Sequence, residues 1–560
     1  MKIKYYIIPL AFLSFNAVGA LAQDKKVEEK TVEEMIEIVR PYKPVLADAF
    51  KLRRSPDLEN IQTYKAKFNY TITERRLELN SDINKVEAEK LIDERPEVLV
   101  NNYFKLGAGL LNTFTTEGYI NTGSDEALQA GLFFRHFGQK SGDFGQLSNH
   151  QQVTAFGKSI LDKFSLQGKL NYQRQGLSFY GFDPLVSTVN PSYAKQSFNL
   201  IEGEGEVFSN YSTDQNALSY AAKANLYTFK DAFSAKESLF TLSASLNKRI
   251  SDLNLGLNFS TELGKTSDVT ISTNNNLLRL NPYIKFQTND IKLTAGVNFV
   301  QEFGSTSDTK IFPTATADLT VVPDYLQLFA EVKGDVNRNT LRDLTKINPY
   351  LGQNQILENS IEKLSIQAGI KGTAGPGFGY KVKIYSQKVN NLPLFANRYG
   401  DIAKFDIIYD RGNTTITGIE GSMSVQVSND LTWTGKINFE QFSPATELHV
   451  WMRPGARINS DLAYNINKKL TLNGAVYIQS DTKAKIYNGP VAQPYVVNHS
   501  NETTKKIKGF VDLGAGIDYK INNQFGVFVK ANNLLNQNNF RYLYYPSFGI
   551  NIFGGISYSF

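Results

Sequence analysis

The alternation of apolar and polar side chains limits what this chain can fold into more than any other feature. From Tyr103 to Phe560 the period of the pattern is two almost throughout. Ile291–Phe299, Leu431–Glu440 and Val511–Tyr519 each place apolar residues at every second position, with polar residues or glycine between them. A period of two gives a strand one apolar and one polar face. Many such segments in succession predict an antiparallel transmembrane β-barrel.

The connections between these segments fall into two classes. The short ones are 250–252, 288–290, 322–324, 374–377, 428–430, 467–469 and 521–523. The long ones are 264–274, 337–362, 389–400, 442–454, 481–506 and 536–547. Short turns at one end and long loops at the other are typical of outer-membrane barrels. The two longest loops, 337–362 and 481–506, are candidates for capturing a ligand or partner, or they are connections without a specific role.

Counting strands back from Phe560 gives about 21, with 401–427 taken as one long strand. The segment Tyr64–Thr73 (YKAKFNYTIT) also alternates and is expected to add one more strand, for a total of about 22. The sequence therefore predicts an all-β fold with a barrel over residues 61–560.

The last ten residues, NIFGGISYSF, have the pattern of a closing strand. Ile552, Ile556, Tyr558 and Phe560 fall on one face, and the segment ends in an aromatic residue. A barrel has no free edge once its last strand has paired. Ile556, Tyr558 and Phe560 are therefore predicted to be the signal that the barrel-insertion machinery recognises.

The amino-terminal region predicts export from the cytoplasm. Residues 1–22 combine Lys2 and Lys4, an apolar run and an Ala-Leu-Ala end, as in a cleaved signal peptide. A charged leader follows over residues 23–60. The chain has no cysteine, so disulfides and thiolate metal ligands are excluded. A net charge of +6 over 560 residues gives no reason to expect nucleic-acid binding. The expected location is the outer membrane of a Gram-negative cell.

Several stretches resemble TonB-dependent receptors. VKANNLLN at 529–536 and the aromatic-rich segment 540–560 resemble the closing hairpin of that family, and TITGIE at 415–420 resembles one of its strands. YKPVLADAFKLRRSP at 42–56, YFKLGAG at 103–109 and FYGFDP at 179–184 are similar to a shorter, Bacteroidetes-type group. The resemblance implies a barrel of the size that encloses a plug domain. Too few residues precede Tyr103 for a full plug, so the plug is expected to be absent or reduced.

The leader contains two segments with alternative interpretations. In TVEEMIEIVR, the apolar residues Met35, Ile36, Ile38 and Val39 resemble the box that pairs with the TonB protein by strand addition. The alternative for the same segment is a solvated charged helix turn or tail. Residues 41–56 carry Lys51, Arg53 and Arg54 and could fill the lumen or serve as a periplasmic linker.

The sequence gives no support for catalysis. The only histidines are His136, His150, His449 and His499, and none lies in a motif that pairs a base with a nucleophile or converges with metal ligands. We therefore expect neither an enzyme nor a cofactor nor a bound metal.

The resemblance implies a receptor or transport conduit for an unidentified substrate. A scaffold barrel within an outer-membrane complex is the alternative, and a passive porin is a third interpretation. The expected partners are outer-membrane lipid and the insertion machinery, together with TonB or another membrane or surface protein.

Overall fold

The computed structural model describes residues 102–122, 127–141, 145–183, 194–210, 217–251, 253–375, 377–426, 430–491 and 495–560. The signal peptide, the leader with Met35, Ile36, Ile38 and Val39, and the segment Tyr64–Thr73 lie outside these residues. No helix in the described ranges is long and apolar enough to cross a membrane.

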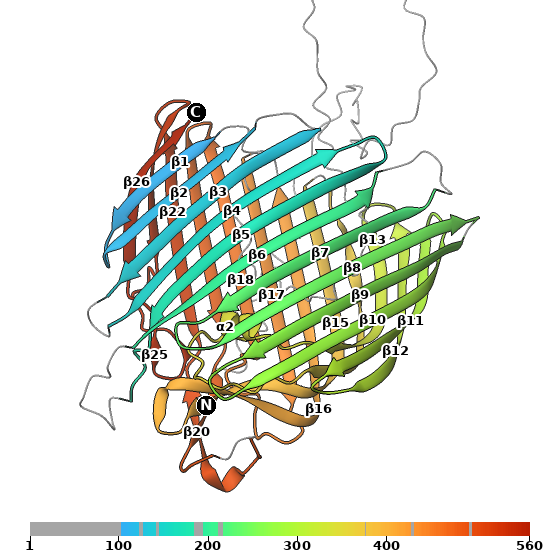
Figure 1. The fold of residues 1–560 in the computed structure, drawn as a ribbon. Helices are drawn as coiled ribbons and strands as arrows, with labels where there is room; N and C mark the ends of the chain where they lie inside the picture. Colours follow the sequence, from blue (N-terminus) through green and yellow to red (C-terminus); the bar gives the residue numbers. More distant parts are fainter. Residues whose placement is uncertain are drawn as a thin grey trace, which may run out of the picture. The chain divides into compact units, whose positions relative to one another are not determined.

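The described residues form a closed antiparallel β-barrel of 22 strands (Figure 1), which confirms the predicted fold class. The first eleven are β1 Tyr103–Gly109, β2 Thr113–Asn121, β3 Leu128–Lys140, β4 Leu147–Ile160, β5 Phe164–Ser178, β6 Lys195–Ser209, β7 Ser219–Lys230, β8 Lys236–Ile250, β9 Leu253–Ser267, β10 Ser272–Gln287 and β11 Ile291–Gly304. The others are β12 Asp308–Val322, β13 Leu326–Asn337, β14 Ser360–Thr373, β15 Phe378–Arg398, β16 Asp401–Gln426, β17 Leu431–Ser443, β18 Ala456–Asn467, β19 Leu470–Gln479, β22 Phe510–Lys520, β23 Phe525–Asn532 and β26 Asn551–Ser559. Each strand pairs with the next one in this order.

The ring closes between its first and last strands. β26 pairs with β23 on one side and with β1 on the other, from Tyr103 opposite Ser559 to Gly109 opposite Phe553. The ring of 22 strands therefore starts at Tyr103, one strand later than the sequence predicted, and Tyr64–Thr73 is not needed to complete it. The long strand predicted over 401–427 is confirmed as β16.

The connections confirm the two predicted classes with two exceptions. The predicted short turns lie at the end of the barrel that carries the carboxyl terminus, and the long connections lie at the other end together with a few short turns such as 305–307 (Figure 1). The predicted loops at 264–274 and 389–400 are wrong, because both are mostly strand. Three long connections contain structure of their own: α2 Leu341–Ile347, the hairpin of β20 Thr482–Tyr487 with β21 Glu502–Ile507, and the small pair β24 Phe540–Tyr542 with β25 Tyr545–Pro546.

The pattern of the strands inverts toward the long-loop end. On β6, Ile201 is 65% exposed on the outer face, while Glu202 lies on the inner face with Arg342. Closer to the loops on the same strand, Phe198 and Leu200 are buried on the inner face and Asn199 takes the outer one. β5, β7 and β8 change in the same way. On these four strands the inner surface is therefore polar along most of its length and apolar at the loop end, where other segments cover it.

β17 provides a direct test of which face is which. Ile437 is 39% exposed, whereas Asn438 binds the Tyr385 hydroxyl on the opposite face. A charge on the lipid face of such a barrel costs about 2–4 kcal/mol near the bilayer centre. We expect Ile437→Arg to prevent assembly and Asn438→Arg to be tolerated, as measured by the heat-dependent shift in gel mobility of the folded barrel. Equal tolerance of both substitutions would show that the faces are assigned the wrong way round.

Candidate functional site

The long connections fold together into one compact layer, which we call the cap. It comprises residues 338–359 with α2, the outer half of the β15–β16 hairpin from Asn391 to Gly412, and the described residues of the connections, 444–455, 480–491, 495–509 and 533–550. In Figure 1, α2, β20, β25 and the outer part of β16 gather at the end of the barrel opposite the carboxyl terminus. The pairing of the barrel strands does not by itself account for this layer, so its contacts are described separately below.

A bend in the β15–β16 hairpin separates its wall half from its cap half. The ladder shifts register between Asn390 and Leu392, where Asn391 has a φ of 61°. On the facing strand Gly412 has a φ of 121°, and a Cβ there would lie 2.8 Å from the Cβ of Ala445. Glycine is needed at this position for both its backbone conformation and its close contact. A bulge of this kind bends a strand away from its neighbours.

Beyond the bend, the hairpin is buried on both faces. Phe395, Phe405 and Ile407 belong to one apolar cluster, and Leu394 and Ile408 belong to another on the opposite side. A strand in a barrel wall has one face toward the lumen and one toward the outside, so it cannot be covered in this way by its neighbours in the ring. The outer half of the hairpin is therefore the middle layer of the cap.

The first cluster joins one wall of the barrel to the cap half of a hairpin that extends from the opposite wall. It contains side chains from β5–β8, from α2 and from the β15–β16 hairpin, together with Tyr545 from the last connection. β16 is the eleventh strand after β5 and lies halfway around the ring of 22. The cap half of this hairpin must therefore extend across the lumen to pack against β5–β8. The cap therefore closes this end of the barrel.

Aromatic side chains fill the centre of this core. The rings of Tyr350 and Tyr545 stack with their centroids 3.6 Å apart, and Tyr180 packs edge-on against both. Their hydroxyls are used within the cap: Tyr180 donates to the Pro546 carbonyl at 2.9 Å and Tyr545 donates to the Ala403 carbonyl. Burial raises the pKa of Tyr350 and of Tyr545 well above the ordinary value, so both remain neutral hydrogen-bonding groups.

A buried ionic cluster joins the β20–β21 hairpin to the connection 444–455. The fully buried Lys485 ammonium lies 2.7 Å from Glu447 and also contacts Glu502, and the rings of Trp451 and Tyr495 lie within cation–π distance of it. Glu447 accepts further hydrogen bonds from the indole N–H of Trp451 at 2.8 Å and from the Tyr495 hydroxyl at 2.7 Å. Two carboxylates facing one cation need that cation to remain close together.

Asp410 joins this cluster to the bend. Its fully buried carboxylate accepts the backbone N–H groups of Ala445, Thr446 and Glu447 at 2.7–2.8 Å, and the Thr414 hydroxyl as well. Burial alone would raise the pKa of Asp410, but these hydrogen bonds hold it below the ordinary value. The bend, the 444–455 connection and the β20–β21 hairpin are thus linked through Asp410 and Glu447.

The buried lysine predicts a large local effect. Lys485→Met keeps the volume but leaves Glu447 and Glu502 facing each other, and breaking a buried ion pair in this way costs about 3–5 kcal/mol. We expect faster hydrogen exchange across residues 482–507 and 444–455 in a barrel that still shows its heat-dependent mobility shift. Lys483→Met, an exposed neighbour on the same strand, is the control. Unchanged exchange in Lys485→Met would show that the cluster does not hold the cap together.

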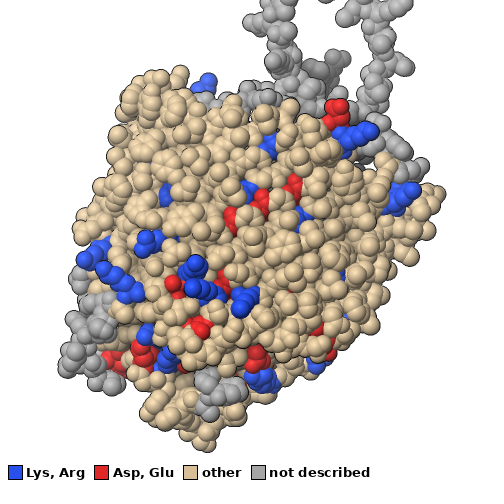
Figure 2. Space-filling view, in the orientation of Figure 1, with Lys and Arg blue, Asp and Glu red and all other residues tan. Residues whose placement is uncertain are grey.

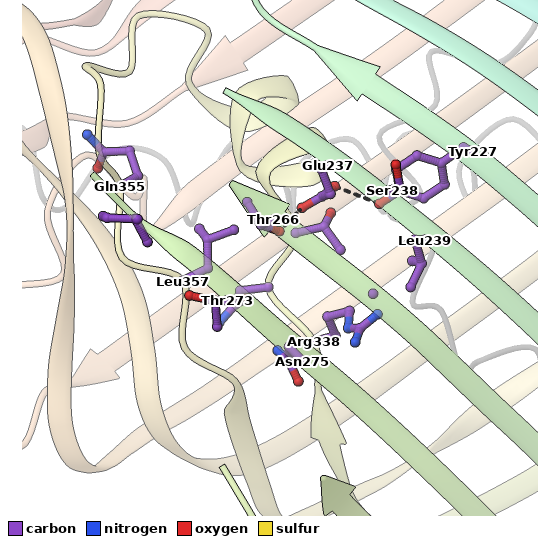
Figure 3. Close-up of a pocket in the computed structure, with 14 residues that line it drawn as sticks. Tyr227, Glu237, Ser238, Leu239, Thr266, Thr273, Asn275, Arg338, Gln355 and Leu357 are labelled. Carbon is purple, nitrogen blue, oxygen red and sulfur yellow. Dashed lines mark hydrogen bonds between the residues drawn. The ribbon is translucent and has the colours of Figure 1, made fainter. Parts of the chain in front are cut away.

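The cap meets the inner wall around a small cavity of about 20 Å³ (Figure 3). Glu237 lies on one side of it, accepting hydrogen bonds from the Tyr227 hydroxyl at 2.7 Å and from the Leu341 N–H at 2.6 Å. Arg338, whose side chain is 6% exposed, lies on another side and is within 3.5 Å of Glu262. A cavity of this volume holds about one or two water molecules. It is a packing feature of the cap rather than a substrate pocket.

The residues predicted from sequence are distributed unevenly with respect to the cap. Ile556, Tyr558 and Phe560 lie at the opposite end of the barrel, with 57%, 36% and 56% of their surfaces exposed. His136 and His150 lie on β3 and β4, whereas His449 and His499 lie in the cap beside Lys483 and Glu502. Asp410, Glu447 and Lys485 were not identified from the sequence. The apolar residues on the inner face at the loop ends of β5–β8 were the available sequence signal for the cap, because apolar side chains facing the lumen predict that another segment covers them.

Comparison with known proteins shows the fold. No family model and no curated protein matches the chain. The siderophore receptor PirA from Acinetobacter baumannii aligns with a TM-score of 0.59 and 11% identity, covering 82% of this chain and 80% of that one. FpvA of P. aeruginosa bound to a pyoverdine aligns with a TM-score of 0.60 and 11% identity, covering 82% of this chain and 71% of that one. The FrpB iron transporter from Neisseria meningitidis aligns with a TM-score of 0.60 and 9% identity, covering 82% of both chains. This chain therefore shares its barrel fold with these three solved proteins.

Proposed function

We propose that the protein is an outer-membrane receptor or transport component of the TonB-dependent-receptor type, closed from outside by its cap. The location is supported by the fold and by the ring of exposed apolar residues, among them Leu170, Ile201 and Ile284, on the outer face of the strands. A signal peptide over residues 1–22 would direct the chain there.

The apolar core that crosses the lumen is the observation that carries this proposal. An unobstructed barrel of 22 strands would let large solutes pass, so a cell needs it to be filled or closed. Here the closure is built from the same external connections that a surface ligand would meet first. Since the cap half of the β15–β16 hairpin is joined to the wall at one bend, displacement of this single element would uncover the lumen.

A scaffold barrel is the second candidate, and the buried Lys485 cluster is the observation that favours it. A cap that opens during each transport event has to break its contacts, and a buried ion pair with two carboxylates makes that costly. A barrel that never opens would serve as a membrane platform for a partner protein.

Planar-bilayer reconstitution and native purification distinguish the candidates. The receptor proposal expects a silent barrel that becomes conductive only when the cap is displaced, and purification without a stoichiometric partner. A silent barrel that always purifies with the same protein would favour the scaffold. Steady, large conductance of the wild-type protein would contradict both and indicate a porin.

The leader is a second possible seal, and its removal is a separate prediction. Residues 40–54 are strongly basic, while the described inner wall carries carboxylates such as Glu204 and Glu440. We expect deletion of Gln23–Ser55 behind an intact signal peptide to leave the barrel folded and to raise sensitivity to large antibiotics. If the permeability of the cells does not change, the cap alone is sufficient to close the barrel.

A further inference from the structure

Four basic side chains project from the outer face of neighbouring strands close to the cap. We call Arg174 of β5, Lys195 of β6, Lys230 of β7 and Lys236 of β8 the outer basic patch. All four are exposed. Figure 2 shows Lys and Arg gathered toward the lower left of this face of the barrel.

Strand register places three members of the patch in one row. Arg174 pairs with Asn199, Asn199 pairs with Lys230, and Lys230 pairs with Lys236. Residues directly opposite each other in an antiparallel pair have Cβ atoms about 4.5–5.5 Å apart. Lys195 lies four residues from Asn199 on the same face of β6, farther toward the cap.

No carboxylate in the described part of the chain pairs with any of these four cations. Basic residues on the inner wall behave differently: Lys223 pairs with Glu204, Lys371 with Asp318 and Lys436 with Glu420. The acidic residues adjacent in sequence to these lysines are engaged elsewhere. Asp231 accepts hydrogen bonds from the backbone N–H groups of Phe233 and Ala235 within its own turn, and the buried Glu237 accepts one from the Tyr227 hydroxyl. The patch therefore has an uncompensated positive charge.

The direct opposition of Lys230 and Lys236 is unfavourable in the isolated barrel. Like charges across a strand pair destabilise it, whereas an anion between two ammonium groups reverses the sign of the interaction. Lysine and arginine are the usual phosphate-binding side chains, and Arg174 adds a planar donor that suits phosphate oxygens.

The surface next to the patch is apolar. Leu170 on β5, Ile201 on β6 and Leu226 on β7 are 67%, 65% and 56% exposed, and they share the outer face with Arg174, Asn199 and Lys230. Tyr172 stands between Leu170 and Arg174, with its hydroxyl 3.4 Å from Asn199. An aromatic residue with a polar tip is typical of a membrane–water interface. A ligand that contacts both parts of this surface must itself be amphiphilic.

We infer that the outer basic patch binds a lipid whose phosphate headgroup carries a net negative charge, with its acyl chains against Leu170, Ile201 and Leu226. This inference rests on the proposed outer-membrane location. The headgroup phosphate lies between Lys230 and Lys236 and within reach of Arg174, while Tyr172 marks the boundary between headgroup and chains. The site tethers one side of the barrel to the lipid leaflet nearest the cap.

The test uses full-length protein, delipidated in detergent, with binding measured by native mass spectrometry. The probes are diphosphorylated lipid A, phosphatidylcholine and inorganic phosphate. We expect lipid A to bind, with an affinity that falls as salt is added, and both other probes to bind far more weakly. Lys230→Gln combined with Lys236→Gln should weaken lipid A binding about 30-fold, which corresponds to about 2 kcal/mol at about 1 kcal/mol for each lysine.

Lys163→Gln combined with Lys248→Gln is the matched control, because both lysines are exposed at the other end of the barrel. Equal loss in both double variants, or no loss in the first, would overturn the assignment. Binding of inorganic phosphate as tight as that of lipid A would also overturn it, because the acyl chains would then contribute nothing. The heat-dependent mobility shift confirms that each variant is folded. Membrane fractionation of cells tests the location separately, so failure of the proposed function and failure of this site are distinguishable.

Discussion

Excision of residues 391–412, with Asn390 and Asn413 joined by an Asn-Gly turn, should open the barrel to ions. These two residues already face each other in the β15–β16 ladder, and Asn-Gly is the favoured two-residue hairpin turn. The excision removes the middle layer of the cap, including Phe395, Phe405 and Ile408, from both apolar clusters. We expect silent wild-type protein and a steady, large conductance from the shortened protein in planar bilayers.

The control replaces residues 305–307, a short turn at the same end of the barrel, with Asn-Gly. It changes a connection that contributes to neither cluster and should leave the bilayer silent. A shortened barrel that folds but stays silent would indicate a second seal, and the same excision combined with deletion of Gln23–Ser55 would then locate it in the leader. Silence of that combined variant would contradict the conclusion that the cap closes the lumen.

Deletion of Tyr558–Phe560 should abolish accumulation of the folded barrel. Tyr558 faces Phe104 of β1 and Phe525 of β23, and the Phe560 N–H donates to the Asn102 carbonyl at 2.9 Å. The deletion therefore shortens the pairing of β26 with β1 and its pairing with β23, and β26 is the strand that closes the ring. We expect loss of the heat-modifiable species and degradation of the chain, as measured by immunoblotting of outer-membrane fractions.

A substitution separates the role of sequence at this end from that of length. Phe560→Ser keeps both pairings of β26 intact and removes the terminal aromatic, so it should slow assembly without preventing it if Ile556, Tyr558 and Phe560 form the insertion signal. Normal folding of the deletion variant would contradict both the pairing argument and the signal.

The barrel could be predicted from sequence because its rules are local. A strand with one face outward and one inward must alternate, and Ile291–Phe299 does so whatever lies around it. The turn at 288–290 and the turn at 521–523 are equally local, since their polar residues suit tight connections. The count from Tyr103 onward was one strand short, about 21 against the 22 of the structure, because local alternation does not fix where one strand ends and the next begins.

The cap could not be predicted from sequence, because its strands obey a different rule. Residues 389–400 contain three asparagines and Pro393, which favour a loop, and the apolar residues among them are not restricted to alternate positions. They form a strand because the cap covers both of their faces. The role of Lys485 could not be predicted from sequence either, because its ion pairs join segments that become adjacent only after the connections have folded over the lumen. Alternation along single strands therefore determined the barrel, whereas contacts between the cap and the wall opposite its hairpin decided that it is closed.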